Sequence, residues 1–123
     1  MGTLTDHREL LAWQQAVNLV ELVYRDTEHF PHHELYGLVS QMRRSAVSIP
    51  ANIAEGAGRN SPRELIQFLG IASGSKAELE THLEIARRLG MIGDDSAVFR
   101  QIERVGQLLT ALRKSLQAQA NPR

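Results

Sequence analysis

The sequence predicts an all-α protein: an antiparallel up-down-up-down four-helix bundle whose second helix is kinked near Pro50. Apolar residues recur every three or four positions through most of the chain, which is the period of a helix with one buried face. No stretch alternates apolar and polar residues with the β-branched enrichment of a strand. Short connections separate the predicted helices, which span residues 6–28, 34–56, 61–89 and 95–117. We therefore expect a single domain over residues 1–123.

The first predicted helix begins at Asp6, because Asp6 and Glu9 have the spacing of a capping box, and it ends before Pro31. Its large apolar residues divide between two faces at about 100° per residue. The face expected to line the core carries Trp13, Val17, Val20 and Tyr24. The roughly opposite face carries Leu11, Leu19 and Leu22.

The second predicted helix begins at Glu34 and contains a proline within its apolar stripe. That stripe consists of Leu35, Leu38, Val39, Met42, Ala46, Ile49 and Ile53. Pro50 removes one backbone hydrogen bond and crowds the carbonyl group of Ala46. Because the stripe continues in register to Ile53, we expect a kink rather than a break.

The third predicted helix has the clearest start, with Ser61 as N-cap, Pro62 at the first helical position and Glu64 completing a capping box. Gly90 is its expected C-cap. Its core stripe is Leu65, Phe68, Leu69, Ala72, Leu79, Leu83 and Ala86. The fourth helix is expected to start at Asp94, Asp95 or Ser96. Its coiled-coil-like seam is Val98, Ile102, Val105, Leu109, Leu112 and Leu116.

Composition excludes several functional classes. The 123 residues include no cysteine, which excludes disulfides, thiolate metal sites and a thiol nucleophile. No apolar run approaches the roughly 18 residues of a membrane span, and the polar first residues differ from a signal peptide, so we expect a cytoplasmic protein with no membrane contact. The zero net charge gives no overall attraction to nucleic acid. Successive quarters of the chain nevertheless alternate in sign, which favours the pairing of neighbouring antiparallel helices.

Two helices carry more apolar surface than a bundle needs, which predicts a homo-oligomer. On the first helix this surface consists of Leu11, Leu19 and Leu22. On the third, small residues at Gly70 and Gly74 would let another helix approach closely, with Ile71 and Ile85 beside them. These seven residues are the predicted subunit interface, although scattered surface leucines are also normal on monomers.

The sequence offers one candidate metal site, a group of three histidines next to Glu34. Its members are His29, His32 and His33. They lie where Pro31 interrupts the helix, and no His-x-x-x-His pair with a carboxylate shares a helical face. We therefore interpret them as loop histidines and expect no metal, no cofactor and no catalytic residue. A metal-dependent hydrolase built on this cluster is the alternative.

Four arginines are the candidate contacts for phosphate groups. Arg43 and Arg44 lie in the second predicted helix, and Arg59 and Arg63 flank the following turn. Their other interpretation is pairing between subunits with acids such as Glu55. The glycine-rich segment 56–61 precedes a helix, but it lacks the Gly-Lys-Ser/Thr motif and the preceding strand of a nucleotide-binding loop.

Several motifs resemble those of a known bacterial family. They are Trp13-Gln14-Gln15-Ala16, Glu34-Leu35-Tyr36-Gly37-Leu38, the run from Gln41 to Gly56 that includes Ser-Ile-Pro-Ala-Asn-Ile-Ala-Glu-Gly, Phe68 to Ser75, Glu78 to Thr81, and Leu89-Gly90. In this order, across roughly residues 10–92, they resemble the four-helix-bundle proteins encoded by intervening sequences in 23S ribosomal RNA genes, which are sometimes labelled ribosomal.

This resemblance implies a ring-like homopentamer whose molecular function is not established. A related branch, the accessory protein of diversity-generating retroelements, is similar in fold and binds its reverse transcriptase and nucleic acid through a strongly basic surface. The present chain differs from that branch in its zero net charge. We expect a non-enzymatic, self-associating interaction or scaffold protein, with RNA or a nucleic-acid enzyme as its candidate partner. Asn52 and Glu55 are expected to tie the second helix to the third.

Overall fold

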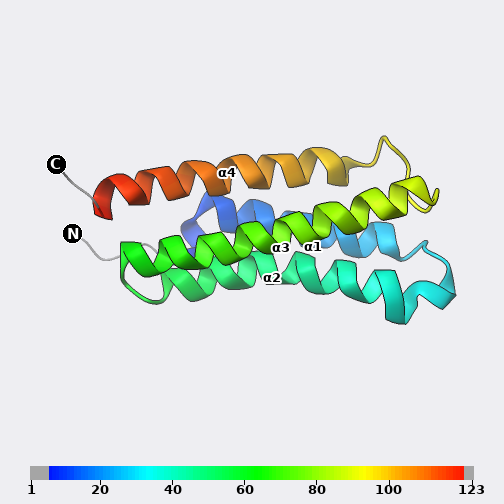
Figure 1. The fold of residues 1–123 in the computed structure, drawn as a ribbon, viewed down its shortest axis with the longest axis horizontal. Helices are drawn as coiled ribbons and strands as arrows, with labels where there is room; N and C mark the ends of the chain where they lie inside the picture. The colour runs from blue at the N-terminus through cyan, green and yellow to red at the C-terminus, as the bar shows by residue number, and fades with distance from the viewer. Residues whose placement is uncertain (1–5, 121–123) are drawn as a thin grey trace.

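The computed structural model describes residues 6–120, which fold into four long helices and contain no strand. The helices are α1 (Leu11–Thr27), α2 (Ser40–Ala57), α3 (Pro62–Arg88) and α4 (Ala97–Ala120). They run alternately up and down the long axis of the molecule (Figure 1). The predicted four-helix bundle is confirmed. The outermost parts of the predicted domain, 1–5 and 121–123, lie outside the described residues.

Each helix packs against its neighbours in the sequence, and the ring closes between the first and the last. α1 contacts α2 and α4, and α3 contacts the same two helices, so α1 and α3 lie on one diagonal. The net charges of the corresponding quarters of the chain alternate, so every packed pair combines opposite signs. The ion pairs found within residues 6–120 are local, however, joining residues of one helix or of its flanking turn.

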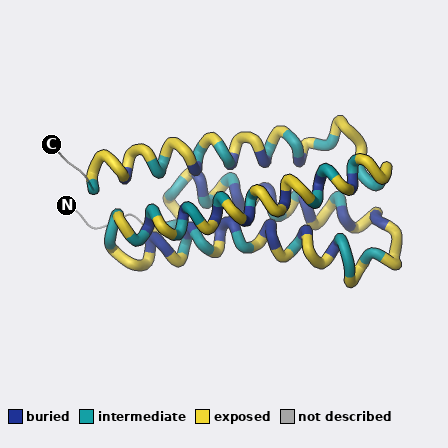
Figure 2. The backbone as a smooth tube through the Cα atoms, in the orientation of Figure 1, coloured by how far each residue is buried: buried dark blue, intermediate teal, exposed yellow. Residues whose placement is uncertain are grey.

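The core is one continuous cluster along the bundle axis, formed by the inner side of each helix (Figure 2). The predicted seams of α3 and α4 are largely confirmed, with Phe68 and Leu112 only half-buried at their edges. The largest fully buried side chains are Leu19, Val23, Met42, Ile49, Ile53, Leu65, Leu69, Leu79, Leu83, Val98, Val105 and Leu109.

The predicted core face of α1 is wrong. The buried residues of this helix are Ala12, Ala16, Leu19, Val23 and Thr27. Leu19 is 0% exposed within a single chain, so it belongs to the core and cannot contact another subunit. Trp13 and Val20 are half-buried and pack against the edge of the core. Val17 is half-buried, and Tyr24 is exposed. Two alanines let α1 approach its neighbours closely, and this places the smaller residues inside and the bulkier ones at the edges.

The start of α1 also differs from the prediction. Asp6 caps a separate 3-10 turn, η1 (His7–Glu9), by accepting a hydrogen bond from the backbone N–H of Arg8 at 2.9 Å. Leu10 is extended (φ −76°, ψ 126°) and separates this turn from α1. The carboxylate of Asp6 also accepts hydrogen bonds from the guanidinium of Arg8, and these contacts hold its pKa well below the ordinary value.

The segment before α2 is irregular where a continuous helix from Glu34 was predicted. A 3-10 turn, η2 (His32–Glu34), leads into a π-helical turn, η3 (Leu35–Val39). Gly37 has non-helical angles inside this turn (φ −111°, ψ −108°), and the carboxylate of Glu34 accepts a hydrogen bond from the N–H of Leu38. The irregular turn rotates Leu35 out of the predicted stripe, and its side chain is exposed.

Other helix boundaries follow the predicted signals. α2 continues through Pro50 without a break. Ser61 caps α3 by accepting a hydrogen bond from the N–H of Glu64. Gly90, with φ of +75°, ends α3 in a Schellman motif in which the N–H of Met91 donates to the carbonyl of Ala86. Ser96 caps α4 and also donates to Asp26 of α1 at 2.6 Å.

Within residues 6–120, no helix is both long enough and apolar enough to cross a bilayer.

Candidate functional site

The four predicted arginines do not form one site. Arg43 lies in the first turn of α2, whereas Arg59 follows the last turn of this helix. At about 1.5 Å per residue, the two lie about 20 Å apart along the helix axis. One phosphate group therefore cannot contact both pairs.

Arg59 is held by contacts within its own chain. Its guanidinium donates a hydrogen bond to Glu55 at 2.9 Å and lies over the ring of Phe68, 5.2 Å from the centroid. The pair of Arg59 and Glu55, one interpretation of which was a contact between subunits, therefore lies within one chain. Within residues 6–120, Glu55 forms an ion pair with Arg59 and none with a residue of α3. Arg63 is exposed in the first turn of α3 and forms no ion pair within residues 6–120.

Arg43 is fixed in place between α1 and α2. Its guanidinium stacks on the ring of Tyr24, 4.5 Å from the centroid, and its Nε donates a hydrogen bond to the hydroxyl of Thr27 at 3.0 Å. Thr27 is buried and itself donates to the carbonyl of Val23. These contacts leave the terminal nitrogens of Arg43 as donors in a pre-set orientation, which suits a carboxylate or phosphate.

A groove of about 530 Å³ lies beside Arg43, between α1, the π-helical turn and α2. Its lining consists of Tyr24, Leu35, Tyr36, Val39, Ser40, Arg43, Arg44 and Val47. Tyr36 is 93% exposed, and Val47 and Leu35 are exposed as well. The lining contains two arginines and no acid. Sequence reasoning identified the arginines but missed the apolar residues around them, because the π-helical turn that exposes Leu35 has no signal in the residue pattern.

The candidate histidine site is not assembled. His29, His32 and His33 are all exposed, and the one contact with Glu34 is that of His33 at 3.7 Å. Among residues 6–120, no three His, Asp or Glu side chains come together in a way that could hold a metal ion.

A polar seam joins α2 and α3 through the residues of the Ser-Ile-Pro-Ala-Asn-Ile-Ala-Glu-Gly motif. The hydroxyls of Ser48 and Ser75 share a hydrogen bond of 2.8 Å between the helices. Asn52 donates to both the hydroxyl and the carbonyl oxygen of Ser48, so it supports this link from within α2. The predicted role of Asn52 is thus indirect.

Ser45 and His82 lie close together in the same seam, 3.4 Å apart, beside a hollow of about 180 Å³. This pair does not have the arrangement of a serine nucleophile and its base. The hydroxyl of Ser45 lies closer to the carbonyl oxygen of Met42, at 3.1 Å, and donates its proton there, not to the imidazole as a serine nucleophile would. The contact is a structural link between the helices.

Gly56 belongs to the packing of α2 against α3 and does not form a phosphate-binding loop. A Cβ atom at this position would lie 2.7 Å from the Cβ of Phe68 and 2.8 Å from Cδ1 of Leu65. Only glycine allows the two helices to approach this closely. The following turn contains Asn60 in the left-handed region, with φ of 57°.

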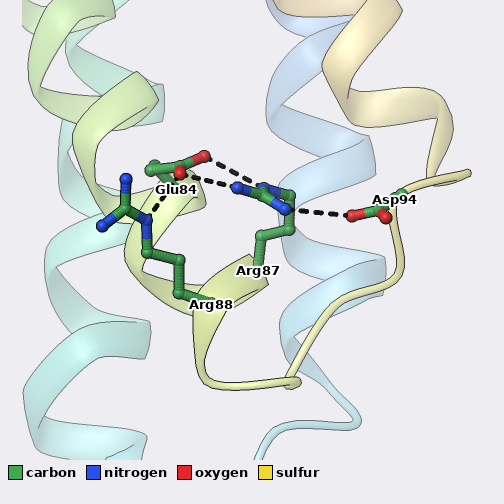
Figure 3. Close-up of polar contacts among 4 residues, drawn as sticks. All are labelled: Glu84, Arg87, Arg88 and Asp94. Carbon is green, nitrogen blue, oxygen red and sulfur yellow. Dashed lines mark hydrogen bonds and ion pairs between the residues drawn. The ribbon is translucent and has the colours of Figure 1, made fainter.

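A charged cluster of two acids and two arginines lies at the end of α3 (Figure 3). Glu84 accepts hydrogen bonds from Arg87 and Arg88, both at 2.7 Å, and Arg87 also contacts Asp94. The hydrogen bond from Arg87, followed by that from Arg88, lowers the pKa of Glu84 to about 2. The same contacts raise the pKa of Arg87. The two acids and two arginines of the cluster compensate one another in net charge.

Most of the predicted interface residues lie at the surface. Ile71 is 51% exposed and Ile85 42% exposed on α3. A Cβ atom at Gly70 or Gly74 would meet no atom within 4 Å. On α1, Leu11 is exposed, but Leu22 is half-buried and packs against the core. With Leu19 in the core, the predicted leucine face of α1 is not a continuous surface, whereas the face of α3 is.

Comparison with known proteins yields a family but no individual relative. No curated protein matches the chain. The family described as 23S rRNA-intervening sequence protein matches residues 8–111, from η1 to the last third of α4. This family is not a known enzyme family. Because the match includes nearly all of the bundle, the chain belongs to the 23S rRNA-intervening sequence protein family.

Proposed function

We propose that this protein is a self-associating, non-enzymatic interaction or scaffold protein, assembled as the ring of five subunits that the family resemblance implies. The observation that carries the proposal is the outer face of α3. Gly70 and Gly74 have no neighbour within 4 Å of a Cβ position, and exposed Ile71 and Ile85 lie beside them.

No packing contact within a single chain requires glycine at position 70 or 74. Each glycine inside a helix costs about 1 kcal/mol relative to alanine. Gly56 offsets that cost by allowing close packing of α2 against α3, but Gly70 and Gly74 face open space. Another helix packed on this face would use the missing side chains and cover the isoleucines.

The structure gives less support to a large nucleic-acid surface. The candidate arginines are divided between two ends of α2, and Arg59 is neutralised by Glu55. A polyanion along α1 and α2 would also meet the acidic first quarter of the chain. RNA contact through Arg43 and Arg44 is therefore an added possibility to test and not the basis of the proposal.

The decisive experiment is light scattering coupled to size exclusion, on protein purified with and without nuclease, with absorbance at 260 and 280 nm recorded. We expect an oligomer, pentameric by mass, in both preparations. A monomer at all concentrations would refute the proposal. An oligomer that carries nuclease-sensitive material would make nucleic acid its partner. In that case, binding should weaken steeply with salt, and an Arg43→Glu/Arg44→Glu variant that loses nucleic acid but keeps the oligomer would assign the phosphate contacts to these two arginines.

A further inference from the structure

We propose that the subunits join head to tail, with the outer strip of α3 from one copy seated in the groove between α1 and α2 of the next. The α3 strip consists of Gly70, Ile71, Gly74, Glu78, Ile85 and Leu89. The α1–α2 groove is the one lined by Tyr24, Leu35, Tyr36, Arg43, Arg44 and Val47. This inference rests on the proposed self-association and specifies the surfaces that meet.

The α3 strip has the form of a helix-packing surface that nothing within the chain covers. Ile71, Glu78 and Ile85 are spaced seven residues apart, so they lie on one side of the helix. Leu89 extends this line and is 62% exposed. Gly74, with open space around it, lies between the first two members and lets a partner approach the backbone. Figure 2 shows the outward-facing turns of α3 as largely exposed.

The α1–α2 groove offers the complementary shape and chemistry. Its exposed Leu35 and Val47 provide an aliphatic floor, and the almost fully exposed ring of Tyr36 provides a wall. Aliphatic walls suit the apolar side of a helix better than nucleobases, whose polar edges they would desolvate.

The charges of the two surfaces match. Arg43 and Arg44 give the groove two positive charges, and no acid lines it. Neither arginine forms an ion pair in residues 6–120. Glu78 is the one acid of the strip, and it likewise lacks an ion pair in this part of the chain. Within one chain Arg44 and Glu78 line the same hollow, so the charge that the groove offers a partner is chiefly that of Arg43, which Tyr24 and Thr27 hold in place. Pairing Glu78 of a second copy with Arg43 would compensate one of the two positive charges of the groove.

Joining two different surfaces produces a closed ring when the rotation between copies permits. A two-fold dimer would instead make the strip-to-groove contact twice across its axis and stop at two copies. The groove lies on the side formed by α1 and α2, and the strip lies on α3, which packs against α2 and not against α1. Both surfaces adjoin α2, where Arg44 of the groove and Glu78 of the strip line one hollow, so each contact turns one copy relative to the last.

The test uses two variants that each block one surface. Gly74→Arg places a long cation on the strip, where no atom of the chain would be displaced. Val47→Glu places a carboxylate in the groove, opposite the expected position of Glu78. The matched controls are Gln107→Arg and Gln107→Glu, on the exposed side of α4. Circular dichroism verifies that all four variants fold.

By light scattering, we expect both blocked variants to have the mass of one chain and both controls the mass of the wild-type oligomer. An equimolar mixture of the blocked variants should form a two-chain complex, because one strip and one groove remain intact between them. Blocked variants that stay oligomeric would overturn this inference while leaving self-association in place. Single-chain variants that do not combine on mixing would show that the strip of one copy does not meet the groove of another, and would overturn it too. A monomeric wild-type protein would instead refute the proposed function itself.

Discussion

At the scale of single residues, the most specific motif of the chain is explained by packing. Ser48 bridges to Ser75, Asn52 supports Ser48, and Gly56 makes room for Phe68. Ile49 and Ile53 lie between them in the core. The motif therefore fixes how α2 meets α3, and its polar residues need no catalytic role.

Replacing Gly56 by alanine should destabilise the fold. The added Cβ would lie 2.7 Å from the Cβ of Phe68, and neither backbone can move away without disturbing the core. Overpacking of this kind costs about 1–3 kcal/mol. Urea denaturation should show that loss for Gly56→Ala. The control is Gly58→Ala, whose Cβ would make only ordinary contacts at 3.6 Å. An equally stable Gly56→Ala protein would contradict the close approach.

Acid should weaken the fold partly through Glu84. The folded state lowers the pKa of Glu84 from 4.5 to about 2, chiefly through the hydrogen bond from Arg87. The stabilisation that ionised Glu84 gives the folded state is therefore present above about pH 4.5 and is lost as the pH falls towards 2. The free energy of unfolding of Glu84→Gln should decline less steeply over that range. Glu103→Gln, on the exposed side of α4, is the control that should keep the wild-type slope.

At the scale of helices, those ends that are set by side chains could be predicted, and those set by the backbone could not. Ser61 and Ser96 act at or next to the predicted boundaries through their hydroxyl oxygens. Gly90 could also be predicted, because its left-handed backbone angle is one that glycine adopts readily. Asp6 has the same signal as the two serines, but Arg8 and an extended Leu10 direct it to a separate turn. The π-helical turn depends on angles at Gly37 that no residue pattern encodes.

Loss of the α3 cap should cost about 1 kcal/mol, because Ser61 accepts the hydrogen bond from the N–H of Glu64 that would otherwise lack a partner. Thermal or urea unfolding of Ser61→Ala measures this loss, and Ser61→Asp should restore most of it. Ser115→Ala, an exposed position in α4, serves as the neutral comparison. If Ser61→Ala is as stable as the wild-type protein, the cap is dispensable.

At the scale of the whole molecule, the composition of a face predicted its exposure on α3 better than on α1. On α3, glycines and isoleucines fall opposite a well-marked core stripe. On α1, both faces carry large apolar residues, and the face that contains Ala12 and Ala16 is the one buried in the core. A prediction based only on the positions of the large apolar residues therefore assigned Leu19 to the outer face of α1. The groove beside Arg43 required knowledge of three separate segments, which no single helical pattern contains.

Self-association also predicts that thermal stability depends on concentration. Binding to the folded form alone raises the midpoint of unfolding as protein concentration rises. Calorimetry over a hundredfold range of concentration should show an increasing Tm for the wild-type protein. Gly74→Arg should show a Tm that does not change with concentration. Equal behaviour of the two proteins would argue against assembly through α3.

The alternation of charge around the bundle bears on which topology the chain selects. With α1 and α3 on one diagonal, like-charged quarters never lie side by side. Exchanging the places of α2 and α3 would leave the hydrophobic stripes buried but would put acid beside acid and base beside base. Electrostatics thus discriminates between arrangements that the core alone cannot distinguish, and salt screens that discrimination. Refolding at high ionic strength should therefore give a larger fraction of molecules in which α2 and α3 have exchanged places.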